Sequence, residues 1–221
     1  KLFILKKMKI LLVGGGTSGH VLPALSVGHA ILRENPQSEI LFLGSRKPAD
    51  REVVEAAGFK FAGIPAGKLR RYWDWRNLSD LFQTVAGFFV SLNIILRFWP
   101  DRVFIKGGYI GVPVGLAAWL CRRPIIIHES DARLGLANRL LMPLAKWVCL
   151  AFPIDSYLIV KRYAKKLVHT GIPINEIFYQ ADIPNNTGIP FSETKPIILI
   201  MGGSQGARAI NQAVKEVLPD W

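Results

Sequence analysis

The chain has 221 residues, of which 50% are hydrophobic and 20% charged, a balance that argues against a disordered protein. Lys and Arg number 28 against 16 Asp and Glu, and the net charge of +12 indicates an anionic partner: nucleic acid, an acidic membrane surface or a phosphorylated substrate. Two cysteines exclude a disulfide scaffold and a four-thiolate zinc site.

Short apolar runs alternate with segments of helical spacing from residue 9 onward. The first run, KILLV, is stopped by three glycines and is typical of a buried parallel strand. Further strands are predicted at 39–43, 60–64, 102–105, 124–127 and 147–150, and helices at 21–33, 51–57, 78–98, 112–120 and 134–141. This alternation predicts an α/β domain with a parallel sheet, whose ligands bind where strands end and helices begin.

The same strand, glycine loop and helix pattern returns near the end of the chain. Residues 184–195 resemble a linker, residues 197–201 (IILIM) predict a strand, and GGSQGA precedes a helix that starts at Arg208. The repetition predicts a second, similar α/β domain that has only begun within these 221 residues.

The first glycine loop, GGGTSGH, has G-x-G-x-x-G spacing between a strand and a helix. Backbone amides and the positive helix end favour a phosphate there. The acid that would hold a nicotinamide cofactor's ribose is missing at the end of the second strand, but Arg46 and Lys47 could accept a ribose phosphate, so an NADP-dependent oxidoreductase stays open. His20 is the last residue of this loop. It is either a general base or a histidine at the start of the helix that forms hydrogen bonds only with the backbone.

Two further segments place polar groups after strands. Tyr109 follows KGG and either donates a hydrogen bond to a ligand or packs in a tight turn. The HESD segment, 128–131, brings an imidazole and two carboxylates to the expected cleft, but no other His or Cys has ligand spacing, so we predict no metal site.

Five motifs occur together and in order: KILLVGGGTSGHVLPAL, KGGYIGVP, IHESDARLGLANRL, HTGIPI and ILIMGGSQGARAIN. With them the chain resembles, from Met8 to about Val217, the MurG family of N-acetylglucosaminyltransferases of bacterial peptidoglycan synthesis. The resemblance implies two Rossmann-like domains of GT-B type, with the first (8–169) complete and binding acceptor and membrane, and the second (170–221) the start of the UDP-GlcNAc domain. It implies inverting transfer of N-acetylglucosamine from UDP-GlcNAc to lipid I to give lipid II, with no cofactor, and we expect this chain alone to be inactive. Alternatives are a UDP-GlcNAc epimerase and a non-catalytic membrane-surface fragment.

The resemblance also implies roles for individual residues. His20 matches the family's proposed base, Thr17, Ser18 and Gly19 match the loop for the acceptor diphosphate, and Tyr109 and Asp131 match acceptor-side positions. The implied UDP-GlcNAc contacts are Thr17, Ser18, Gly19, Asp131, Asn175, Ser204, Gln205 and Gly206. The chain departs from the family pattern at three positions. Ser18 replaces a glycine, Asp131 stands where the family often has asparagine, and Asn175 stands where the family has arginine.

A stripe on the long helix suggests how such an enzyme reaches a lipid substrate. Spacings of four, three and three residues place Leu78, Phe82, Val85 and Phe88 on one helix face. With the preceding Trp73 and Trp75 and nearby arginines, they predict a peripheral anchor on the anionic cytoplasmic face of the bacterial membrane. The alternative is that the stripe packs on the sheet. Because polar residues interrupt the helix, we predict no transmembrane span, and we expect no nucleic-acid partner.

Overall fold

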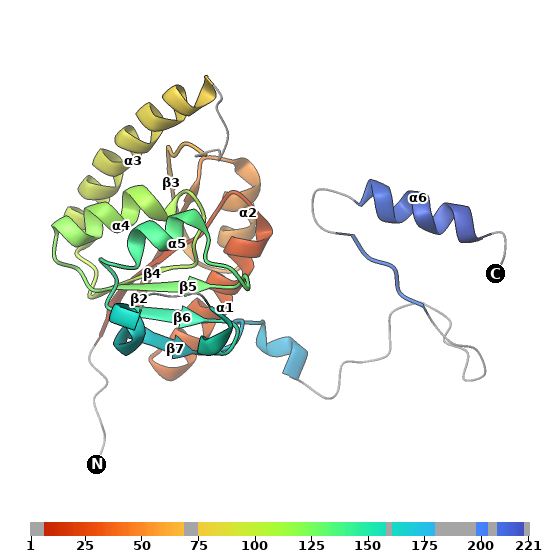
Figure 1. Ribbon diagram of the computed structural model, residues 1–221. Coiled ribbons are helices and arrows are strands. Elements are labelled where there is room, and N and C mark those ends of the chain that lie inside the picture. The colour runs from red at the N-terminus through yellow and green to blue at the C-terminus, as the bar shows by residue number, and fades with distance from the viewer. Residues whose placement is uncertain (1–6, 69–74, 158–160, 180–197, 203–206, 219–221) are drawn as a thin grey trace, which may run out of the picture. The chain divides into compact units, whose positions relative to one another are not determined.

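The computed structural model describes residues 7–68, 75–157, 161–179, 198–202 and 207–218. The chain divides into two units, Lys1–Phe178 and Tyr179–Trp221, which we describe separately (Figure 1). The first contains the sheet and most of the helices.

Unit 1 is built on a seven-stranded parallel sheet of order β3-β2-β1-β4-β5-β6-β7. The strands are β1 (Lys9–Val13), β2 (Glu39–Ser45), β3 (Lys60–Ile64), β4 (Arg102–Ile105), β5 (Ile125–Glu129), β6 (Trp147–Leu150) and β7 (Leu167–His169). The parallel α/β architecture expected from the sequence is therefore confirmed. The edge strand β7 was not predicted, because its three residues are too few for a recognisable pattern.

Helices cover both faces of this sheet. They are α1 (Ser18–Glu34), α2 (Pro48–Ala56), α3 (Arg76–Phe98), α4 (Gly111–Leu120) and α5 (Leu136–Leu141), with short 3-10 turns η1 (Ile154–Ser156), η2 (Lys161–Lys166) and η3 (Glu176–Tyr179). Alternate residues of β1 enter two separate cores: Leu11 packs with residues of α3, α4 and α5, and Leu12 with residues of α1 and α2. β1 is therefore buried on both faces, which explains why its sequence is an unbroken apolar run.

The strand register brings the candidate loops to one edge of the sheet. Val13 pairs with Leu43 on one side and with Ile105 on the other. Because all the strands are parallel, the segments that follow β1, β4 and β5 leave the sheet at the same edge.

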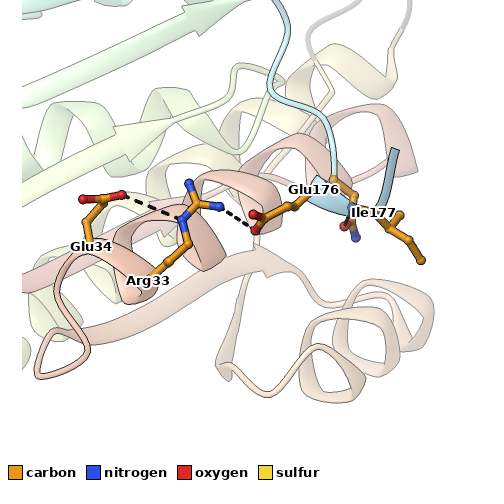
Figure 2. Close-up of polar contacts among 5 residues, drawn as sticks. Arg33, Glu34, Glu176 and Ile177 are labelled. Atoms are coloured by element: carbon orange, nitrogen blue, oxygen red, sulfur yellow. Dashed lines mark hydrogen bonds and ion pairs between the residues drawn. The ribbon is translucent and has the colours of Figure 1, made fainter. Parts of the chain in front are cut away.

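The residues that follow β7 contact other elements within unit 1. The Arg33 guanidinium, near the end of α1, forms an ion pair with the Glu176 carboxylate (Figure 2). The Arg33 Nη1 and Glu176 Oε2 atoms are 2.5 Å apart. His128 of β5 contacts the Gly171 carbonyl through Nε2 at 2.9 Å. These contacts agree with a division of the chain after Phe178, and the domain boundary expected at Thr170 stays a prediction.

Unit 2 contains α6 (Arg208–Val217), which begins where the sequence predicts a helix. A strand was predicted at 197–201, but the described residues 198–201 have no regular secondary structure, and Leu199 is 76% exposed. A strand needs a neighbour to complete its backbone hydrogen bonds, and none of the described residues of this unit belongs to a strand.

Candidate active site

The glycine loop after β1 follows a path that side chains would block. A Cβ at Gly15 would lie 2.6 Å from Ile110 Cδ1, and Gly16 has a φ of +86° beside the Tyr109 ring. Gly14 N donates to the Leu43 carbonyl at 3.1 Å. The loop is therefore held close to β2 and to the start of α4.

The start of α1 has backbone donors without acceptors. The amides of His20 and Val21 donate to the Thr17 carbonyl at 3.1 and 3.3 Å, whereas the Thr17 side chain makes no capping bond and no acid lies in the first turn. Within the described part of the chain, the amides of Ser18 and Gly19 have no acceptor, and both residues are exposed. These donors and the positive helix end suit an anionic group of a ligand.

A buried carboxylate, which the sequence analysis missed, anchors this loop. Asp50 Oδ2 accepts hydrogen bonds from Gly16 N at 2.9 Å, Ser45 N at 3.1 Å and Ser45 Oγ at 2.5 Å. Asp50 lies in the first turn of α2, where an acid would ordinarily be assigned to its own helix end. Its sequence position therefore gave no sign of a contact 34 residues away.

A cavity of about 280 Å³ opens at the carboxyl edge of the sheet. Its lining includes three of the candidate residues, His20, Tyr109 and Asp131, together with Lys106 and Glu129. They come from the start of α1, from the segment that follows β4, and from the end of β5 and the segment after it. The structure thus brings together residues separated by up to 111 positions (131 − 20).

The His20 ring lies against Gly108, where an added Cβ would be 3.1 Å from the ring Cδ2. Burial lowers the pKa of His20, and the positive charge of Lys106 lowers it further, while Asp131 and Glu129 oppose the shift. The imidazole is consequently neutral at pH 7 and able to accept a proton. Its Nδ1 is buried and has no hydrogen-bond partner among the described residues.

Glu129 organises the loop that carries Asp131. Its carboxylate accepts hydrogen bonds from Asp131 N at 3.0 Å, Gly135 N at 2.7 Å and Asn138 Nδ2 at 3.0 Å. Asp131 itself is exposed at the cavity. Of the two HESD carboxylates, one is therefore structural and the other is available to a ligand.

Tyr109 is half-buried between the glycine loop and the cavity. Burial raises the pKa of its phenol, and the negative charges of Asp50 and Asp80 raise it further, although a hydrogen bond with Ser45 acts in the opposite direction. The phenol is protonated at pH 7 and can donate a hydrogen bond.

The remaining candidates lie elsewhere. Asn175 lines a separate groove of about 520 Å³ between α1, α2 and residues 172–178, and its side-chain oxygen accepts the Ile177 amide at 3.0 Å. Ser204, Gln205 and Gly206 lie outside the described residues. The described ranges contain no group of three or more His, Cys, Asp or Glu residues that could hold a metal ion.

The helix stripe is largely exposed where the structure describes it. The exposed fractions are 81% for Trp75 and 68% for Phe82, Leu78 and Val85 are also exposed, and Phe88 is half-buried against the core. Trp73 lies outside the described residues. Among the residues that the structure describes, one helical stretch, Leu78–Phe98 of α3, is long and apolar enough to cross a membrane by length and composition, with a mean hydropathy of 1.6.

Residues 10–150 match the model of the glycosyltransferase family 28 N-terminal domain. The chain is 42% identical over 213 residues to a Clostridium botulinum UDP-N-acetylglucosamine–N-acetylmuramyl-(pentapeptide) pyrophosphoryl-undecaprenol N-acetylglucosamine transferase, covering 95% of this chain and 58% of that protein. A Lachnoclostridium phytofermentans protein of the same name is 42% identical over 96% of the chain and 58% of its own length. The crystal structure of Acinetobacter baumannii MurG is similar, with a TM-score of 0.69, 28% identity and coverage of 97% of this chain and 58% of that one. The chain thus spans a little over half the length of these relatives.

Proposed function

The chain belongs to glycosyltransferase family 28, and on that premise we propose that it is the acceptor-binding part of an enzyme that transfers N-acetylglucosamine from UDP-GlcNAc to lipid I, yielding lipid II. The observation that carries the proposal is the placement of His20 in the cavity, directly after a helix start with free amides. The names of the 42%-identical relatives favour this transfer over the oxidoreductase and epimerase alternatives.

In the proposed reaction, His20 removes the proton from the attacking hydroxyl of the acceptor. The hydroxyl oxygen forms the new bond to the anomeric carbon as the bond to UDP breaks, so the configuration inverts and the leaving electron pair stays on the diphosphate. A neutral imidazole supports this role, because a protonated ring could not accept the proton.

The acceptor's diphosphate binds at Thr17, Ser18 and Gly19 in this proposal. The uncapped amides of the helix start supply hydrogen-bond donors, and the helix dipole favours the negative charge. Tyr109 donates a further hydrogen bond, while the exposed Asp131 carboxylate accepts one from a sugar hydroxyl.

The donor UDP-GlcNAc is proposed to contact Asn175, Ser204, Gln205 and Gly206, in addition to the residues near His20. Asn175 and His20 line two different cavities. A donor bound beside His20 therefore needs contacts with residues outside the His20 cavity. Because these donor contacts extend beyond the His20 cavity, we expect no turnover by these 221 residues alone. We also propose that the transfer uses no cofactor.

Substitution of His20 tests the proposal in a chimera that joins this chain to the rest of the C. botulinum relative. His20→Asn should reduce transfer to a soluble lipid I analogue by about 10²- to 10⁴-fold, the usual contribution of a general base. His29→Asn, an exposed histidine on the same helix, is the matched control and should retain activity. Equal activity of the two variants would refute the role of His20.

We also propose that α3 is a peripheral anchor on an anionic membrane surface. Its outer face exposes Leu78, Phe82 and Val85, and Trp75 just before the helix is also exposed, whereas Ser91 on its inner face is fully buried. The exposed apolar face on a chain of net charge +12 is suited to a lipid surface with negative head groups.

Co-sedimentation with phosphatidylglycerol vesicles tests this anchor. Phe82→Ser should weaken binding and leave the free energy of unfolding nearly unchanged, because its side chain is 68% exposed. Binding should also weaken at high salt as surface charges are screened. Intact binding combined with an unfolded domain would show that the stripe belongs to the core.

A further inference from the structure

Lys106 is a buried cation to which the proposed reaction assigns no task. It follows β4, its side chain is 2% exposed, and it lines the cavity that contains His20. Its Nζ donates to Ser130 Oγ at 2.6 Å. An ammonium has three N–H donors, and its burial is costly unless it is hydrogen-bonded and paired with an opposite charge.

The negative groups near Lys106 do not neutralise it by contact. Within the described part of the chain, no ion pair of Lys106 lies within 4.0 Å. Glu129 is already engaged by two backbone amides and Asn138, and Asp131 is exposed at the cavity. The charge of the fixed ammonium therefore acts on the cavity rather than being cancelled by one partner.

His20 receives charge from two neighbouring segments. Lys106 faces it from the end of β4, and Glu129 and Asp131 face it from the end of β5, while α1 itself has no acid in its first turn. Lys68 also lines the cavity and is exposed. Without Lys106, only the burial of the ring would oppose the effect of the two carboxylates on the imidazole.

We propose that Lys106 is a positioning residue: held in place by Ser130, its buried ammonium acts together with the burial of the ring to keep His20 uncharged in the presence of Glu129 and Asp131. Burial is the larger cause that lowers the pKa of His20, and the charge of Lys106 is the next. This order agrees with the position of both residues at the same cavity. Burial also lowers the pKa of Lys106, while Glu129 and Asp131 raise it. Only the catalytic meaning of a neutral His20 rests on the proposed function.

The test is the titration of His20 in the 221-residue chain, followed by NMR of ¹³C-labelled histidine rings. The chain has four histidines, and the signal of His20 is identified by its loss in His20→Asn. Lys106→Met removes the charge and keeps the length of the side chain. It should raise the midpoint of His20 by about half to one pH unit, a three- to tenfold gain in proton affinity, as expected for one charge at short range in a protein.

Matched variants separate charge from structure. Lys68→Met removes an exposed cation from the same cavity and should leave the His20 midpoint unchanged, since water screens it. Lys106→Arg, which keeps the positive charge, should retain the native His20 midpoint.

An unchanged His20 midpoint in folded Lys106→Met would overturn the proposal. If Lys106→Met does not fold, Lys106→Gln, which can still hydrogen-bond Ser130, replaces it. Failure of both to fold, with Lys106→Arg folded, would show a purely structural cation and would equally overturn the proposal. A shifted midpoint together with full transfer activity of His20→Asn would instead reject the proposed base and leave the role of Lys106 intact.

Discussion

Removing the Asp50 carboxylate should loosen the glycine loop and destabilise the whole domain. Asp50→Ala leaves two backbone donors, Gly16 N and Ser45 N, without their acceptor, while the Ser45 hydroxyl can rotate. An orphaned buried donor costs about 1–3 kcal/mol. Because Gly16 is only part-buried, water can reach it, and we expect a total of about 3 kcal/mol, or roughly a hundredfold in the folding equilibrium.

Urea unfolding measures this loss, with Glu52→Ala as the matched control. Glu52 lies two residues further along α2 and is exposed, so its removal should change the free energy of unfolding by less than about 0.5 kcal/mol. Hydrogen exchange should accelerate locally at the Gly16 and Ser45 amides in Asp50→Ala. Equal stability of the two variants, with both amides still protected, would refute the anchoring role.

Three further outcomes follow from packing and charge. Gly28→Ala places a Cβ 2.8 Å from buried side chains of β1 and of the α2–β3 connection, and it should lower the free energy of unfolding by about 1–3 kcal/mol. Gly19→Ala, whose Cβ would meet nothing closer than 3.8 Å, should not lower it, and urea unfolding midpoints distinguish the two variants. Asn138→Asp puts a second carboxylate 3.0 Å from Glu129 and should cost about 2–4 kcal/mol at pH 7 but less at pH 4, as measured by thermal unfolding at both pH values. Burial lowers the pKa of His128 below its ordinary 6.5, so the unfolded chain binds the proton more readily and the free energy of unfolding should fall as pH decreases through 6.5. His128→Gln should flatten that part of the stability–pH profile, and an unchanged slope would contradict the role given to His128.

The fold was largely predictable because the strands of a parallel sheet are buried on both faces. Runs such as KILLV therefore stand out as continuous apolar segments ended by glycine. The sequence also allowed a prediction that His20, Tyr109 and Asp131 lie at one cavity. All three follow parallel strands, whose carboxyl ends share one edge of the sheet.

The supporting contacts were not predictable, because they join side chains that are distant in sequence. Nothing near Asp50 indicates that it binds Gly16, and the Lys106–Ser130 bond depends on the pairing of β4 with β5. The strand expected at 197–201 shows the opposite limit. Its apolar pattern is suitable, but a strand forms only when another strand accepts its hydrogen bonds.

The strand order has a consequence for folding during synthesis. β1 lies between β2 and β4, and Lys9 N donates to Asp101 Oδ2 across 92 residues of chain. At translation rates of about 5–20 residues per second, the edge of β1 that pairs with β4 stays unpaired for roughly 5–20 seconds, until β4 has been synthesised. During that interval the apolar residues of β1 can pair only with β2, and the nascent chain presents an open strand edge to chaperones and to neighbouring chains.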